Sequence, residues 1–277
     1  MSYKIEKIAI GGIGGSGTRA VAQLFLELGY FMGDDLNPQK DNLLYTLLFK
    51  RKDILLMPKI ELEKRLDFFY NYSSTNYDLS DHEIEWLLSL AKDANIEHSK
   101  EWLHQRALNC IKNTPDMHEN WAWKEPNTHI IIDKILEYSP DLKFIYVYRN
   151  GLDMAFSFNQ QQLKFWGEIF LNKFQLEITP KNSLNYWCKV HQRMKSIQKM
   201  YPENIYMLDL DRLCDNIGES LSHLFDFLGI ENVEINKYKE IFIKPKSIGR
   251  YRNFPDEEFN KDDIDYVKEV YKRDFII

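Results

Sequence analysis

A glycine-rich turn between a short apolar strand and a helix restricts the fold of this chain more than any other feature. The strand covers Ile8–Ile10, the turn runs through residues 11–18, and apolar spacing predicts a helix from Arg19 to Leu28 that stops at Gly29. Glycine has no Cβ, so such a backbone can approach an anion closely. The free N–H groups and the dipole of a helix N-terminus favour negative charge. The turn therefore predicts a phosphate-binding loop.

Three phosphate-binding motifs compete for this loop. Gly12, Gly14 and Gly17 have the spacing of the dinucleotide-binding motif G-x-G-x-x-G. A Walker A loop requires lysine followed by serine or threonine, and Thr18-Arg19 stands there instead. The third motif is the 5'-phosphosulfate loop of sulfotransferases, which Ser16-Gly17-Thr18 resembles. The choice depends on other segments.

A second segment resembles the 3'-phosphate motif of the sulfotransferase superfamily. The apolar strand Leu142–Tyr148 ends at Arg149, and Ser157 follows eight residues later on the next predicted helix. In that superfamily these two residue types bind the 3'-phosphate of 3'-phosphoadenosine 5'-phosphosulfate. The resemblance agrees with the chemistry, because arginine offers a planar fork of donors that suits phosphate.

Two further segments extend the resemblance. Lys124-Glu125-Pro126 lies 25 residues before Arg149, like the Lys-Asp/Glu-Pro of tyrosylprotein sulfotransferases and many bacterial relatives. This likeness implies that Lys124 stabilises the leaving group. Residues 243–254 carry four basic side chains around Gly249 and resemble the loop that closes over the nucleotide. In a chain of net charge −6, a polyanionic ligand explains this basic cluster.

The resemblance extends over approximately residues 1–35 and 120–255 of the chain. It implies an α/β fold. We expect a P-loop-NTPase-like three-layer sandwich with a central parallel sheet, in a single domain over 1–277. Helical patterns over 42–49, 60–70, 81–94 and 98–112 predict an all-helical insertion at about 41–118, over the active-site face. Residues 159–182 lack a clear period, and they could form a lid, an acceptor-binding loop or part of the core.

The resemblance also implies the nucleotide-binding residues. Gly15 stands where many family members have lysine or arginine, and Arg19 is a plausible substitute because glycosaminoglycan sulfotransferases carry a similar Gly-Thr-Arg. The implied residues are Gly14, Gly15, Ser16, Gly17, Thr18, Arg19, Arg149, Ser157, Lys246, Ser247, Gly249 and Arg250.

The sequence narrows the choice of general base less than it does the choice of the other site residues. Family members with a carboxylate base often place it 17 to 20 residues after the threonine of the loop, a spacing that selects Asp35. Glu125 precedes a proline, which favours extended backbone, so its side chain should face away from that of Lys124. The candidates are, in order, Asp35, Asp41 and Glu125, with Asp34 also considered and His129 next in line.

The resemblance therefore implies sulfuryl transfer from 3'-phosphoadenosine 5'-phosphosulfate to a hydroxyl or amine of a small-molecule, carbohydrate or peptide acceptor, with Lys124 as a catalytic residue. A metal ion is not required, because a sulfuryl group carries less charge than a phosphoryl group. One alternative is a Rossmann-type oxidoreductase, which needs a second strand ending at Asp34 or Asp35 and leaves Arg149 and Ser157 unexplained. Another is a non-catalytic nucleotide-binding protein, which Gly15 permits.

Composition restricts the partners. The acidic balance, with a pI of about 5.7, argues against nucleic acid. Residues 1–7 lead at once into the first strand, and no apolar run reaches membrane-spanning length, so we expect a cytoplasmic protein without a membrane span. Cys110, Cys188 and Cys214 are widely spaced, which favours reduced thiols over a disulfide framework. The seven scattered histidines predict no metal site.

Overall fold

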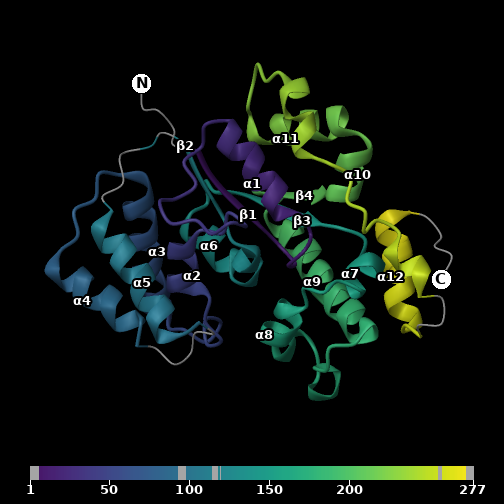
Figure 1. Cartoon of the computed structure of the whole chain (residues 1–277), viewed down its shortest axis with the longest axis horizontal. Coiled ribbons are helices and arrows are strands. Elements are labelled where there is room, and N and C mark those ends of the chain that lie inside the picture. The colour runs from purple at the N-terminus through teal and green to yellow at the C-terminus, as the bar shows by residue number, and fades with distance from the viewer. Residues whose placement is uncertain (1–5, 93–97, 114–117, 119, 255–257, 273–277) are drawn as a thin grey trace. The chain divides into compact units, whose positions relative to one another are not determined.

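The strand, turn and helix predicted near the N-terminus are present in the computed structural model, which describes residues 6–92, 98–113, 118, 120–254 and 258–272 (Figure 1). β1 (Glu6–Gly12) enters the turn, and α1 (Thr18–Glu27) leaves it. Gly29 follows the helix with a φ of +85°, a conformation that glycine adopts without strain. The predicted phosphate-loop scaffold is therefore confirmed as a local structure.

Among the described residues, four strands form the sheet, in the order β2-β1-β3-β4, with β2 (Asn120–Lys124), β3 (Lys143–Tyr148) and β4 (Ile205–Asp209). β1 and β2 are parallel, and Ile10 lies opposite Lys124. Parallel neighbours that are distant in sequence need helical connections, which is typical of α/β folds. The predicted α/β, P-loop-like fold with a central parallel sheet is confirmed.

The chain divides into two units. The first contains residues 1–11 and 21–144, and the second contains residues 12–20 and 145–277. The single domain over 1–277 stays a prediction.

The predicted helical region lies in the first unit. Within it, α2 packs on α3 and α5, and α4 packs on α5 (Figure 1). A capping box formed by Ser80 and Glu83 opens α4, at the predicted start of this helix. That helix ends at Leu90, whereas the predicted end at Ala94 lies outside the described residues. Besides most of α1, the described helices of this unit are α2 (Leu43–Phe49), α3 (Lys59–Ser74), α4 (Asp81–Leu90), α5 (Lys100–Lys112), α6 (Ile132–Tyr138) and the 3₁₀ helix η1 (Pro126–Ile130).

Aromatic rings fix β2 to these helices. Trp121 and Trp123 are buried, and their ring centroids lie 5.6 and 5.3 Å from that of Phe69 on α3. Tyr45 on α2 stacks on Trp123. Each such aromatic pair contributes about 0.5–1.5 kcal/mol beyond the burial of its surface. The rings therefore hold the strand whose last residue is Lys124.

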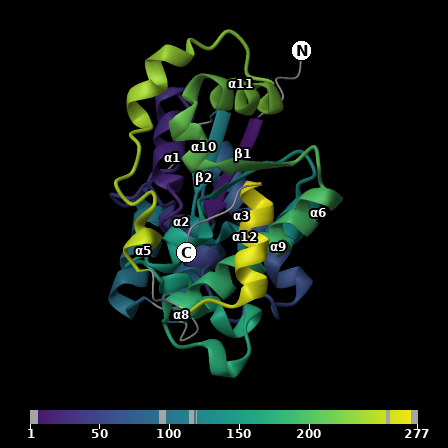
Figure 2. The ribbon, with the colours of Figure 1, turned by 90° about the vertical axis from the view of Figure 1, so that its right-hand side faces the viewer.

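The second unit packs around its longest helix, α9. The bounds of its helices are α7 (Gly151–Ala155), α8 (Gln161–Phe170), α9 (Pro180–Met200), α10 (Leu210–Asp215), α11 (Ile217–Leu228), α12 (Lys261–Tyr271) and the 3₁₀ helices η2 (Lys173–Gln175), η3 (Ile235–Ile241) and η4 (Arg250–Asn253). α7, α8 and α12 all pack against α9, and Figure 2 shows α12 in yellow beside it. A Cβ on Gly151 would lie 2.7 Å from the Trp187 ring, so glycine is needed for the close approach of α7 to α9.

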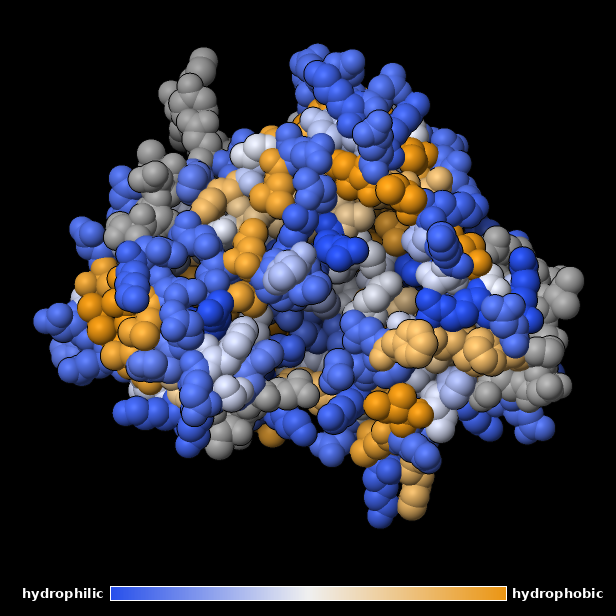
Figure 3. Space-filling model, viewed as in Figure 1, coloured by the Kyte–Doolittle hydropathy of each residue, from blue (hydrophilic) through white to orange (hydrophobic). Residues whose placement is uncertain are grey.

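The segment without a clear sequence period is partly helical. Residues 159–182 contain α8, η2 and the first residues of α9. Phe158 and Phe174 are exposed, as are the side chains of Ile169 and Ile178. The face in Figure 3 is largely hydrophilic, with apolar residues in separate patches. The segment therefore presents apolar side chains to solvent.

Candidate active site

The predicted phosphate-binding turn, which lies in the second unit, requires glycine at its two ends. A Cβ on Gly12 would lie 2.2 Å from the carbonyl oxygen of Val147, and one on Gly17 would lie 2.2 Å from Leu210. The side chain of Ser16 is buried, and its Oγ has no hydrogen-bond partner among the described residues. An unpaired buried hydroxyl at a helix N-terminus fits an anionic ligand.

Ser157 lies beside this turn, two residues after the end of α7 at Ala155 and not on the helix where it was predicted. A Cβ on Gly15 would lie 3.3 Å from Ser157 Oγ, and Gly15 has a φ of +93°. Two motifs that are far apart in the sequence are thus brought together. A lysine or arginine at position 15 would be strained at this φ, which gives a physical reason for the departure from the family pattern. Arg19, the suggested substitute, is exposed.

Arg149 is held by a carboxylate. Its Nε donates to Asp211 Oδ1 at 3.1 Å, and the backbone N–H of Asn150 donates to Asp211 Oδ2 at 3.0 Å. Arg149 and Asp211 are both buried, yet Arg149 Nη2 has no hydrogen-bond partner within the described part of the chain. Asp211 therefore fixes the plane of the guanidinium and leaves a donor for another acceptor, an arrangement that suits phosphate.

The predicted basic loop lies on α7 in the same unit. Arg250 Nη1 donates to the carbonyl oxygen of Phe156 at 2.8 Å, and the N–H of Gly249 donates to Asp153 at 2.8 Å. Lys246 is exposed. The second unit therefore contains all four groups of predicted nucleotide-binding residues: the turn, Arg149, Ser157 and this loop.

Sequence reasoning missed three polar residues that support these groups. Asp211 and Asp153 are described above, and Gln162 donates from Nε2 to the carbonyl oxygen of Gly12 at 3.1 Å. All three are buried. The sequence did contain a signal for Asp211, because this residue lies just after β4. In α/β proteins, ligands commonly bind at the carboxyl ends of the strands.

Lys124 is paired with Asp41 in the first unit. The lysine is 2% exposed at the end of β2, and its ammonium contacts the Asp41 carboxylate and the carbonyl oxygen of Gln39, the latter at 3.2 Å. Asn37 holds Asp41 from the other side through two hydrogen bonds of 2.8 Å. The lysine is buried and the Asp41 side chain is partly exposed, and the net stability from such a pair is small because desolvation offsets much of the attraction.

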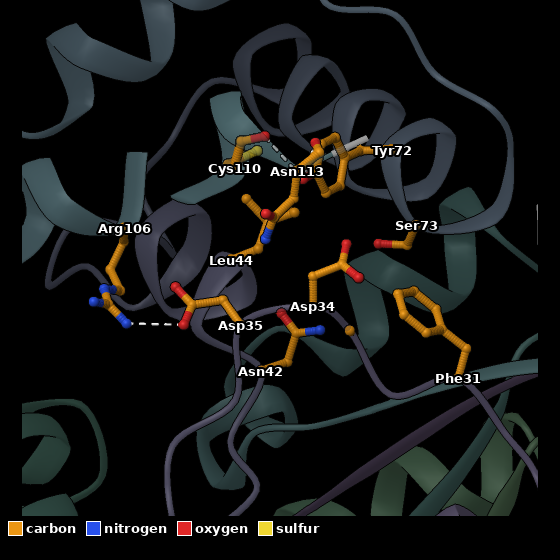
Figure 4. Close-up of a pocket in the computed structure, with 11 residues that line it drawn as sticks. Phe31, Asp34, Asp35, Asn42, Leu44, Tyr72, Ser73, Arg106, Cys110 and Asn113 are labelled. Carbon is orange, nitrogen blue, oxygen red and sulfur yellow. Dashed lines mark hydrogen bonds and ion pairs between the residues drawn. The ribbon is translucent and has the colours of Figure 1, made fainter. Parts of the chain in front are cut away.

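Asp35, the first candidate for the base, has other partners. Its Oδ1 accepts from Arg106 at 2.9 Å, and its Oδ2 accepts from Asn109 at 3.0 Å. Figure 4 shows the Asp35 carboxylate pointing toward Arg106. Asp35 lines a cavity together with Asp34 and Phe31. That cavity has a volume of about 20 Å³, which is room for about one water molecule.

Glu125 and His129 are turned into the protein. Glu125 is 2% exposed and accepts from the backbone N–H and the side-chain amide of Asn127, so it caps η1. Burial raises the pKa of its carboxyl. His129 is also buried, and its Nδ1 contacts the carbonyl oxygen of Pro126 at 2.8 Å. Of the candidate bases, Asp41 is the one in contact with Lys124.

Comparison with known proteins gives the family. Two similar solved structures are the sulfotransferase domain of the Synechococcus PCC 7002 olefin synthase (12% identity, 98% of this chain and 95% of that chain, TM-score 0.49) and a sulfotransferase domain from the curacin biosynthetic pathway (15% identity, 84% and 77%, TM-score 0.42). A third is a Mycobacterium avium sulfotransferase (11% identity, 98% and 76%, TM-score 0.41).

No curated protein matches the sequence. None of the helices in the described ranges is long and apolar enough to cross a membrane. The model of the sulfotransferase family matches residues 8–234, which is most of the chain. The chain therefore belongs to the sulfotransferase family.

Proposed function

We propose that this protein transfers a sulfuryl group from 3'-phosphoadenosine 5'-phosphosulfate to a hydroxyl or amine. The observation that carries this proposal is that two buried donors at the predicted nucleotide-binding groups, Ser16 Oγ and Arg149 Nη2, have no hydrogen-bond partner among the described residues. The proposed donor has an anionic group for each of them, a phosphosulfate and a 3'-phosphate. ATP and NAD have no 3'-phosphate, so they would leave Arg149 without this partner.

The residues of the second unit fit this donor. Backbone amides from Gly14 to Thr18, with Ser16 Oγ, would bind the phosphosulfate. Arg149 and Ser157 would bind the 3'-phosphate, with the basic loop around them. The residues of that loop are Lys246, Ser247, Gly249 and Arg250.

The contact between Lys124 and Asp41 supports two roles in the reaction. A bond forms between the acceptor oxygen or nitrogen and sulfur while the bond from sulfur to the 5'-phosphate oxygen breaks. Asp41 takes the acceptor proton, and Lys124 stabilises the charge that develops on the leaving oxygen. The products are the sulfated acceptor and 3',5'-adenosine bisphosphate. The observed contact favours Asp41 over Asp35 as the base, although sequence spacing selects Asp35.

The acceptor in this proposal is a small molecule, a carbohydrate or a peptide. Phe158 and Phe174 support an apolar contact with it, because both rings are exposed in the segment that follows Ser157. We also propose a cytoplasmic location. It is supported by three free cysteines, and burial raises the pKa of Cys110 to about 12 and that of Cys214 to about 11, which disfavours the reactive thiolate.

The purified protein should bind 3',5'-adenosine bisphosphate more tightly than 5'-AMP. A charge-assisted hydrogen bond contributes about 1.5–3 kcal/mol, so the 3'-phosphate should increase affinity by about tenfold or more. Isothermal titration calorimetry with both nucleotides measures the ratio. Equal affinities would refute the donor assignment, and tighter binding of NAD than of either nucleotide would favour the dinucleotide alternative.

Arg149→Lys should reduce affinity for 3',5'-adenosine bisphosphate to near that for 5'-AMP. Lysine keeps the charge but lacks the planar fork that Asp211 orients, and a charged hydrogen bond to phosphate is worth about 1.5–3 kcal/mol. The same titrations measure this loss, with exposed Arg212→Lys as the matched control. An Arg149→Lys protein that still prefers the 3'-phosphorylated nucleotide would show that Arg149 has another role.

A further inference from the structure

Asp153 on α7 is a buried carboxylate whose two oxygens both bind backbone amides of the basic segment 244–254. Oδ2 accepts from the N–H of Gly249 at 2.8 Å, and Oδ1 accepts from that of Tyr251 at 3.2 Å. The residue is 3% exposed. Burial raises the pKa of its carboxyl, while the two amide hydrogen bonds act in the opposite direction by stabilising the carboxylate. These bonds fix the backbone of the segment at two neighbouring points.

The segment has two more attachments to the end of α7. Arg250 Nη1 donates to the carbonyl oxygen of Phe156, and the Phe156 ring stacks on Phe254 with centroids 4.2 Å apart. All these attachments fall on residues 153–156, which lie between Arg149 and Ser157 in the chain. The predicted 3'-phosphate pair therefore flanks the short helix α7 (Gly151–Ala155) on which the basic segment docks.

We propose that Asp153 is a positioning residue that fixes the basic segment 244–254 on α7, so that its cations act with Arg149 and Ser157 on a 3'-phosphate. The inference rests on the proposed function and adds to it the residue on which selectivity for the 3'-phosphate depends. A carboxylate close to a phosphate site would ordinarily repel the ligand. Here both of its oxygens are bonded to amides, so its charge serves to hold the segment.

Asp153→Asn tests the proposal. Asparagine keeps one acceptor oxygen, so one of the two hydrogen bonds to the segment can still form. At the other position its NH₂ group faces a backbone N–H, and because both groups are donors, that hydrogen bond is lost. Affinity for 3',5'-adenosine bisphosphate should fall by about tenfold, the equivalent of one such hydrogen bond. Affinity for 5'-AMP should not change. In nucleotide-free protein, amide hydrogen exchange over residues 245–254 should become faster. Asp265→Asn, an exposed change on α12, is the control and should alter neither measurement.

Phe254→Ala provides a second variant if Asp153→Asn does not fold. Phe254 is 46% exposed and holds the outer end of the same segment, so its loss should give the same pattern. Unchanged exchange together with an unchanged ratio of the two nucleotide affinities would overturn the proposal. An equal loss of both affinities would also overturn it. If the wild-type protein shows no preference for the 3'-phosphorylated nucleotide, the proposed function fails. Amide hydrogen exchange over residues 245–254 in Asp153→Asn then decides by itself whether Asp153 holds the segment.

Discussion

Asp41→Asn should reduce turnover by about 10²–10⁴, the usual effect of losing a general base. The amide has nearly the same shape as the carboxylate but cannot take the acceptor proton. Asn37 can still hold the side chain, because its amide donates to the oxygen that asparagine retains. Affinity for 3',5'-adenosine bisphosphate should stay unchanged, since in the proposed reaction Asp41 acts on the acceptor and not on the nucleotide. Turnover with labelled donor and a pool of acceptors measures the rate.

Asp35→Asn and Glu125→Gln are the matched controls for this experiment. Both remove a carboxylate charge in the same unit, but Asp35 pairs with Arg106, and Glu125 caps η1. We expect these two variants to keep most of their activity. A large loss in Asp35→Asn with normal turnover in Asp41→Asn would move the base to Asp35. In that case, the spacing rule would be correct and the contact with Lys124 incidental.

Lys124→Met should lower kcat by about 10²–10³, the effect of removing one donor that stabilises transition-state charge. Nucleotide affinity should remain, because this charge develops only during the reaction. Methionine preserves much of the apolar volume of the buried lysine side chain. Single-turnover rates with labelled donor, together with calorimetry, separate the two quantities.

The double variant Lys124→Met/Asp41→Asn controls for folding. Lys124→Met alone leaves the partly exposed Asp41 carboxylate without its cation, which should destabilise the protein by less than the cost of breaking a fully buried pair, about 3–5 kcal/mol. The double variant removes both charges and should unfold at a higher temperature than the single variant. A Lys124→Met protein that is folded and turns over at the wild-type rate would show that the lysine is structural.

The sequence predicts those site residues that belong to a recognisable motif or that lie at the end of a strand. Arg149 could be singled out because a buried strand ends just before it, whereas Ser157 was expected on the next helix and lies two residues beyond the end of α7 at Ala155. The contact of Ser157 with the turn follows from the same fold. Helices α2 to α5 were predictable from apolar spacing and from the capping box at Ser80.

Contacts between distant segments could not be predicted in the same way. Asp211 lies 62 residues after Arg149, and Gly249 lies 96 residues after Asp153. No local pattern specifies which carboxylate meets which donor, since tertiary packing decides it. The order of Asp35 and Asp41 illustrates this point: spacing from Thr18 favours the first, whereas the pairing of Lys124 favours the second. Residues 30–42 contain isolated bridges at Phe31 and Leu36 instead of the second strand that a dinucleotide-binding fold requires.

The positive φ of Gly15 has a consequence for product release. With no side chain at this position, the turn offers the sulfuryl group hydrogen bonds but no cation of its own. Under the proposed function, most of the affinity for the donor would then come from Arg149, Ser157 and the basic segment, which contact the part that donor and product share. The spent nucleotide would bind about as well as the fresh one. Turnover would then slow as the nucleotide accumulates, unless another enzyme hydrolyses its 3'-phosphate.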